Sequence, residues 1–327
     1  MHSNKILNFL NLRLIFILSL MHSLAFAQSF NVKDVECLDI NGLNISNPFA
    51  GGINAPQFNE IDMNFDGVDD LLILDREGGV TIPYIYENGN YVFAPEFRDN
   101  FPKLIQWVRL RDYNNDGIKD IFCYNIEAPI DGIEIYKGFN NNGEIGFEKY
   151  TQTFGDLEII YFELNDKYYN LQVTSNDIPD VIDVDSDGDL DIISFLGDEP
   201  FVRWYKNMSI EDGVSLDNPR YLLETICWGR FRENGFNERI TLSNNPNTCA
   251  DGFNDEDPIN SRHAGSTISL YDDDGDGNYE ALVGDLSNEN MTWLYNGGTP
   301  DNAWMTSQDT LFPSYDKPIE NYIFNAA

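Results

Sequence analysis

The sequence predicts an all-β protein, a β-propeller of four-stranded antiparallel blades that carry calcium-binding loops. Three observations predict this fold: a nine-residue acidic motif that occurs four times, a short apolar run directly after each copy, and a tyrosine at a nearly constant distance from each copy. A four-stranded unit that is repeated about every 40–60 residues is typical of a propeller blade.

The acidic motif reads acid, spacer, Asp or Asn, spacer, Asp-Gly, two spacers and a final acid. Oxygen-bearing side chains at positions 1, 3, 5 and 9 of a tight loop suit Ca²⁺, which takes about six to eight oxygen ligands. The glycine at position 6 permits the sharp turn because it has no Cβ, and position 7 can offer its backbone carbonyl. The predicted side-chain ligands are Asp62, Asn64, Asp66, Asp70, Asp112, Asn114, Asp116, Asp120, Asp183, Asp185, Asp187, Asp191, Asp272, Asp274, Asp276 and Glu280, and the predicted carbonyl ligands are Val68, Ile118, Asp189 and Asn278.

The spacing excludes an EF-hand, which needs a bidentate glutamate at position 12. Position 12 of the four copies holds Ile73, Cys123, Ser194 and Val283. We expect about four Ca²⁺ ions, one in each loop. Because affinity rises with ligand charge, we expect the loop at 183–191 to bind most tightly and the two loops with Asn at position 3 to empty first.

The residues after each loop predict the strands of a blade. Each final acid is followed by an apolar run rich in β-branched and aromatic residues, which indicates a buried strand rather than a helix. A tyrosine near the end of a further strand lies 24, 24, 22 and 23 residues after the first aspartate (86 − 62, 136 − 112, 205 − 183, 295 − 272). This constancy indicates one structural unit used four times.

The N-terminus predicts a secretory signal over residues 1–27, with Lys5 and Arg13 before the apolar core Leu14–Leu20 and a small-residue cleavage site at Ala25–Ala27. The apolar core is too short to span a membrane. We therefore expect an exported protein without a transmembrane segment, secreted or held at the cell surface. Residues 28–327 are assigned to the propeller, with blades around 50–101, 102–175, 176–261 (with an inserted loop near 228–262) and 262–312, and the start of a further blade at 313–327.

These motifs resemble the FG-GAP/VCBS repeats, the calcium-loop β-propellers that include the integrin α-subunit head. Asn54–Phe58, Leu110–Tyr113 and Arg262–Thr267 are similar to a secreted VCBS subfamily of Bacteroidota. The resemblance covers about residues 40–327 and implies calcium on one face of the propeller and binding on exposed loops, with no single shared ligand or activity.

Such relatives usually continue through further blades to a sorting domain. Since no fifth loop follows residue 313, we expect a partial sequence; the alternative is a compact propeller of five blades, one of them degenerate.

Charge and composition favour a binding module over an enzyme. The formal net charge of −35 opposes binding to nucleic acid and anionic lipid. His263 is the one histidine outside the signal, and no Gly-x-Ser-x-Gly, His-Glu-x-x-His, Walker loop or Cys-x-x-Cys motif is present. We therefore expect no catalytic residues. The prediction is a non-enzymatic binding or adhesion module for a protein or carbohydrate ligand. The alternative is a calcium-assisted polysaccharide lyase or another carbohydrate-active propeller, because paired carboxylates are abundant.

Two features of the third repeat stay open at this stage. Export permits disulfides, and a bridge between Cys227 and Cys249 would close the inserted loop, whereas Cys123 is expected to be a free thiol in the core. The aromatic and basic segment Cys227–Phe236 suits either ligand contact or packing that anchors the insertion. Trp107, Trp204 and Trp293 are expected in the core.

Overall fold

The computed structural model describes residues 37–127, 129–152, 157–197, 199–234, 240–250, 266–285 and 291–314. The chain divides into two compact units, Met1–Pro48 and Phe49–Ala327. In the first unit, Leu38 pairs with Asn44 across a short turn. The predicted signal at 1–27, His263 and nearly all of 313–327 lie outside the described residues.

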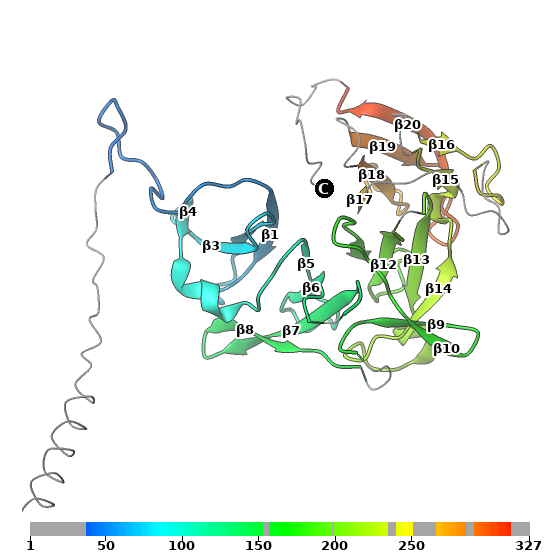
Figure 1. Cartoon of the computed structure of the whole chain (residues 1–327), viewed down its shortest axis with the longest axis horizontal. Coiled ribbons are helices and arrows are strands. Elements are labelled where there is room, and N and C mark those ends of the chain that lie inside the picture. The colour runs from blue at the N-terminus through cyan, green and yellow to red at the C-terminus, as the bar shows by residue number, and fades with distance from the viewer. Residues whose placement is uncertain are drawn as a thin grey trace, which may run out of the picture. The chain divides into compact units, whose positions relative to one another are not determined.

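Four sheets of the second unit, whose blade strands pair in antiparallel fashion, are arranged as a β-propeller, which confirms the predicted fold class (Figure 1). The first sheet contains β1 (Pro56–Ile61), β2 (Asp70–Asp75), β3 (Val80–Glu87) and β4 (Asn90–Phe93). The second contains β5 (Val108–Arg111), β6 (Asp120–Tyr124), β7 (Ile133–Asn141) and β8 (Glu144–Lys149). The fourth contains β17 (Ser266–Tyr271), β18 (Glu280–Asp285), β19 (Met291–Asn296) and β20 (Met305–Phe312).

The third sheet is larger, with six strands. Its blade strands are β11 (Asp180–Ile182), β12 (Asp191–Phe195), β13 (Val202–Asn207) and β14 (Tyr221–Thr225). A hairpin of β9 (Tyr161–Leu164) and β10 (Lys167–Asn170) extends it, because β9 pairs in parallel with β14. The hairpin falls within the range 102–175 assigned to the second blade, yet its hydrogen bonds join it to the third sheet.

Helix is scarce in the described part of the chain. It comprises the 3₁₀ turns η1 (Pro95–Asn100) and η2 (Trp228–Arg230) and the one-turn helix α2 (Ser209–Asp212). None of the helices among the described residues is long and apolar enough to cross a membrane. The insertion in the third repeat adds the short pair β15 (Phe231–Arg232) and β16 (Thr241–Leu242).

Each acidic loop connects the first and second strands of its blade. In every blade the last residue of the first strand pairs with the final acid of the loop, as the pairs Ile61–Asp70, Arg111–Asp120, Ile182–Asp191 and Tyr271–Glu280 show. The prediction that each loop opens directly into a strand is therefore confirmed. The repeated tyrosines lie on the third strands β3, β7, β13 and β19, as their spacing predicts.

The hydrophobic core lies between consecutive blades. Three clusters of buried side chains combine blades one and two, two and three, and three and four. Successive residues of a second strand point to opposite neighbours, since strand side chains alternate between the two faces. Ile121 joins the cluster shared with the first blade and Phe122 the one shared with the third. This two-sided burial explains why the strands read as continuous apolar runs.

The predicted core residues of the strands are buried. Trp107, Trp204 and Trp293 expose 0%, 3% and 6% of their surface, and Cys123 is a buried free thiol. Cys227 and Cys249 are bonded to each other, with their Cα atoms 6.1 Å apart. The disulfide closes the insertion.

The insertion is also anchored by aromatic packing. Trp228 and Phe231 are buried in the cluster between blades three and four. Of the two uses considered for the segment Cys227–Phe236, packing therefore accounts for these two aromatic residues, whereas Phe236 lies outside the described residues.

Buried charges join the first strands of three blades. Arg109 of β5 donates through Nε to the carbonyl of Pro179 (2.9 Å) and through a terminal nitrogen to Ser269 Oγ (3.0 Å). Asp180 of β11 accepts from the Leu270 amide (2.8 Å) and pairs with Arg111 at 3.2 Å. Burial lowers the pKa of Arg109, and the nearby Asp180 carboxylate opposes this shift. The buried charges of Arg109 and Asp180 therefore compensate each other.

We predict that Asp180→Asn lowers the free energy of unfolding by about 3 kcal/mol, because it leaves two arginines without their buried carboxylate. Denaturant unfolding at fixed calcium concentration measures the effect. Glu199→Gln is the control, since Glu199 is 47% exposed and pairs with Arg203 at the surface, where an ion pair contributes less than about 1 kcal/mol. Equal losses in the two variants would contradict a special role for the buried network.

Candidate metal centres

The first aspartate organises each acidic loop in the same way. Its two carboxylate oxygens accept the amides of positions 5 and 6, at 3.1 and 2.9 Å in the case of Asp62. The equivalent distances are 3.1 and 2.8 Å at Asp112, 3.0 and 3.0 Å at Asp183, and 3.1 and 3.1 Å at Asp272. The four loops thus share one backbone conformation that wraps around the first side chain.

Two positions of each loop adopt left-handed backbone conformations. The glycine at position 6 has φ of 85° at Gly67, 86° at Gly117, 105° at Gly188 and 86° at Gly277, as predicted. Position 4 also has positive φ, of 56° at Phe65, 58° at Asn115, 63° at Ser186 and 75° at Gly275. Asparagine and glycine tolerate this region and could have signalled it, whereas phenylalanine and serine give no such signal.

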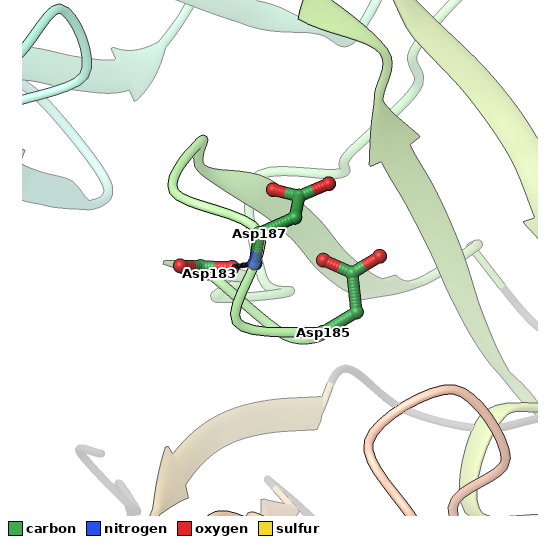
Figure 2. A group of neighbouring side chains, drawn as sticks. All are labelled: Asp183, Asp185 and Asp187. Atoms are coloured by element: carbon green, nitrogen blue, oxygen red, sulfur yellow. Dashed lines mark hydrogen bonds between the residues drawn. The ribbon is translucent and has the colours of Figure 1, made fainter. Parts of the chain in front are cut away.

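The side chains at positions 3 and 5 fold back onto the loop. Asn64 accepts the Asp66 amide at 3.0 Å, and Asp66 accepts the Val68 amide at 2.9 Å. In the third loop, one carboxylate oxygen from each of Asp183, Asp185 and Asp187 lies within 4.8 Å of the others (Figure 2). The same holds for Asp272, Asp274 and Asp276 in the fourth loop. The structure therefore brings the predicted ligands at positions 1, 3 and 5 together.

The acid at position 9 is buried and ties two parts of the blade together. One oxygen of Asp70 accepts the Met63 amide of its own loop at 2.9 Å, and the other accepts the Tyr86 amide of β3 at 2.8 Å. The equivalent acids bind loop and third-strand amides in the same manner, namely Asp120 to Tyr113 and Gly138, Asp191 to Val184 and Asn207, and Glu280 to Asp273 and Asn296. This structural role was not predicted from the sequence.

Burial disfavours the ionised form of these acids. Desolvation raises the pKa of Asp120 to about 7 and also raises the pKa of Asp70, Asp191 and Glu280, while the backbone amides oppose the shift. A carboxylate has about four lone-pair positions, so two amide bonds leave room for a cation. The metal-ligand role of position 9 stays a prediction.

The third loop contains charged partners that the sequence did not reveal. Lys206 of β13 pairs with Asp185 and with Glu211 of α2, and its Nζ lies 3.6 Å from Asp187. The side chain of Asp189, whose carbonyl was the predicted ligand, accepts the Ile210 amide at 2.9 Å. In the second blade, the corresponding Lys137 lies 3.8 Å from Asp116. In both blades the lysine directly follows the repeated tyrosine, so the sequence contained a signal for these ion pairs.

Neighbouring loops contact one another. Lys119 of the second loop pairs with Asp69 of the first at 2.9 Å, and Asn115 donates to the carbonyl of Gly188 in the third at 3.2 Å. Three of the four loops therefore gather at the same end of their blades.

We predict that Gly188→Val destabilises the protein by about 1–3 kcal/mol, because a branched residue at φ 105° is strained. No atom lies within 4 Å of a Cβ added at this glycine, so the cost comes from the backbone alone. Gly52→Val is the control, since its Cβ also meets open space and its φ is not left-handed. Thermal unfolding of both variants in excess calcium tests this, and a loss at Gly188 no larger than at Gly52 would contradict it.

Comparison with known proteins is consistent with the repeat geometry. Residues 62–123, which contain the first two loops, match the FG-GAP-like repeat family model. No curated protein matches the chain significantly. A solved structure of an Agrocybe aegerita lectin, described as recognising non-reducing terminal N-acetylglucosamine, is similar at 14% identity and a TM-score of 0.36, covering 82% of this chain and 67% of the lectin chain. The family match supports the interpretation of the first two acidic loops as FG-GAP-like repeats.

Proposed function

We propose that this chain is a calcium-loaded β-propeller that acts as a non-enzymatic binding module for a protein or carbohydrate ligand, exported and secreted or held at the bacterial cell surface. The observation that carries the proposal is the common geometry of the four loops. Each presents oxygens from positions 1, 3 and 5 on one tight turn, which is the donor set that a hard cation prefers. In this proposal calcium has a structural role, and it fixes the connection between the first two strands of each blade.

Two surface features support a ligand-binding role. A small open pocket of about 130 Å³ lies beside the disulfide and is lined by polar groups of Glu224, Arg230, Asp301 and Asn302. Arg230 donates to Asn302 at 2.9 Å, so the guanidinium is held in place. The pocket is smaller than the roughly 300–1,000 Å³ of sites that enclose a drug-sized ligand, and its polar lining suits one hydroxyl-rich end of a ligand.

Exposed aromatic rings on the fourth blade offer a second contact area. Tyr271 and Tyr295 are 52% and 44% exposed, and both pack against Trp293 with ring centroids 6.0 and 6.5 Å away. Exposed tyrosines on a rigid sheet are frequent in protein interfaces and suit stacking on sugars.

We predict that calcium chelation lowers the melting temperature by at least about 10 °C, since each ion present at 100 times its Kd stabilises by about 2.7 kcal/mol. Differential scanning calorimetry in excess calcium and in excess chelator measures the shift. Asp66→Asn should reduce the calcium-dependent part of the shift. Asp69→Asn should leave it unchanged, because Asp69 occupies a spacer position of the same loop and pairs with Lys119. An equal melting temperature with and without chelator would refute calcium loading.

We predict that the protein binds members of a glycan or protein array without cleaving uronate polymers. Array binding in excess calcium, and absorbance of the unsaturated product during incubation with polyuronates, separate a binding module from a lyase. Arg230→Ala should weaken a ligand held in the pocket at least about tenfold, the loss of one charge-assisted hydrogen bond. Formation of unsaturated product that depends on the native fold would establish the lyase alternative instead.

A further inference from the structure

The third blade contains a second acidic cluster beside its loop. One carboxylate oxygen from each of Asp187, Asp189 and Glu211 lies within 4.8 Å of the other two. Asp187 also belongs to the predicted calcium loop, where it lies beside Asp183 and Asp185 (Figure 2). The two groups of carboxylates therefore share one residue.

The second cluster includes buried oxygen atoms that lack a donor. Asp189 is 1% exposed, and its Oδ1 has no hydrogen-bond partner among the described residues, while Oδ2 is used by the Ile210 amide. Oδ2 of Asp187, the residue that both groups share, also lacks a hydrogen-bond partner there, as does Oδ1 of Asp185 in the adjoining loop group. Leaving a buried carboxylate oxygen without a donor or cation is costly.

The charges present do not balance. Three carboxylates, those of Asp185, Asp187 and Glu211, lie around the ammonium of Lys206. A fourth, that of Asp189, lies beside Asp187 and Glu211. Lys206 contacts Asp185 and Glu211 but leaves Asp189 Oδ1 unpaired. One positive charge cannot compensate four negative charges at partly buried positions, so a divalent cation is the expected complement.

We propose that the third blade holds a second Ca²⁺, bound by the side chains of Asp187, Asp189 and Glu211, with Asp187 bridging to the ion of the loop itself. This inference rests on the proposed calcium loading of that loop. All three ligands are carboxylates, which suit a hard cation. Lys206 leaves Asp185 and Asp187 when the two ions bind, since its long side chain is flexible.

The site is restricted to the third blade by two residues. Position 7 is Asp189 only here, whereas the other loops have Val68, Ile118 and Asn278 at this position. Glu211 is supplied by α2, the only α-helix in the described part of the chain. The remaining blades therefore cannot form the same pair of ligands.

Calcium stoichiometry of the whole chain tests the proposal. Native mass spectrometry and equilibrium dialysis with Ca²⁺ alone should give about five ions for the unaltered protein, one per loop plus the additional ion. Asp189→Asn and Glu211→Gln should each give about four. Asp212→Asn is the matched control, because it removes the same charge from the same helix while its carboxylate pairs with Arg220 outside the cluster.

The outcomes distinguish this proposal from the proposed function. About four ions in the unaltered protein, unchanged by both substitutions, would overturn the second site and leave the four loops intact. No bound calcium at all would overturn the calcium loading itself.

Lys206→Met should lower the half-saturating calcium concentration of the additional ion about tenfold by removing a competing positive charge. Weaker binding in this variant would show that Lys206 assists the site and would contradict the proposed exchange. Since Glu211 is one-third exposed, its substitution keeps the test informative if Asp189→Asn fails to fold.

Discussion

The blade geometry depends on a buried carboxylate at the first residue of each second strand. This acid accepts one amide from the loop before it and one from the strand after it, so that a single side chain fixes a turn and two strands. Removing the charge from water is unfavourable, as the raised pKa of Asp120 shows. The amides offset this cost, and a nearby cation would lower the pKa further. For this reason the acidic loops, besides offering oxygen ligands, also determine the backbone conformation where the first two strands of each blade connect.

The blades are held to each other by apolar packing and, at their first strands, by buried ionic hydrogen bonds. Arg109 reaches backbone carbonyls of two other blades, which no aliphatic residue could do. Because the loops follow directly from these first strands, fixing the strands also fixes where the loops lie. The contacts of Lys119 and Asn115 with the adjacent loops are a result of that arrangement.

Much of the repeat could be predicted from local sequence, because its signals are local. The order of oxygen-bearing residues, the glycine at position 6 and the apolar run determine the loop and the following strand within about fifteen residues. Contacts between distant segments left no such signal. The pairing of β9 with β14, the partners of Arg109, and the approach of Lys206 and Glu211 to the third loop all depend on tertiary packing. The sequence predicted only the backbone carbonyl of Asp189 as a ligand and gave no sign of a role for its side chain. In the structure this side chain accepts the Ile210 amide.

The placement of the core between blades has a consequence for fluctuations of the molecule. Since each described apolar cluster joins only two consecutive blades, the apolar part of the stability approximates a sum of nearest-neighbour terms. The hydrogen bonds of Arg109 add a link between the second and fourth blades. Blades two and three contribute to two clusters each, so a local opening there loosens two contacts at once. Amide hydrogen exchange should therefore show similar protection in two adjacent blades that share a cluster. The change in protection caused by a destabilising substitution should decrease with each interface between the substituted blade and the blade observed.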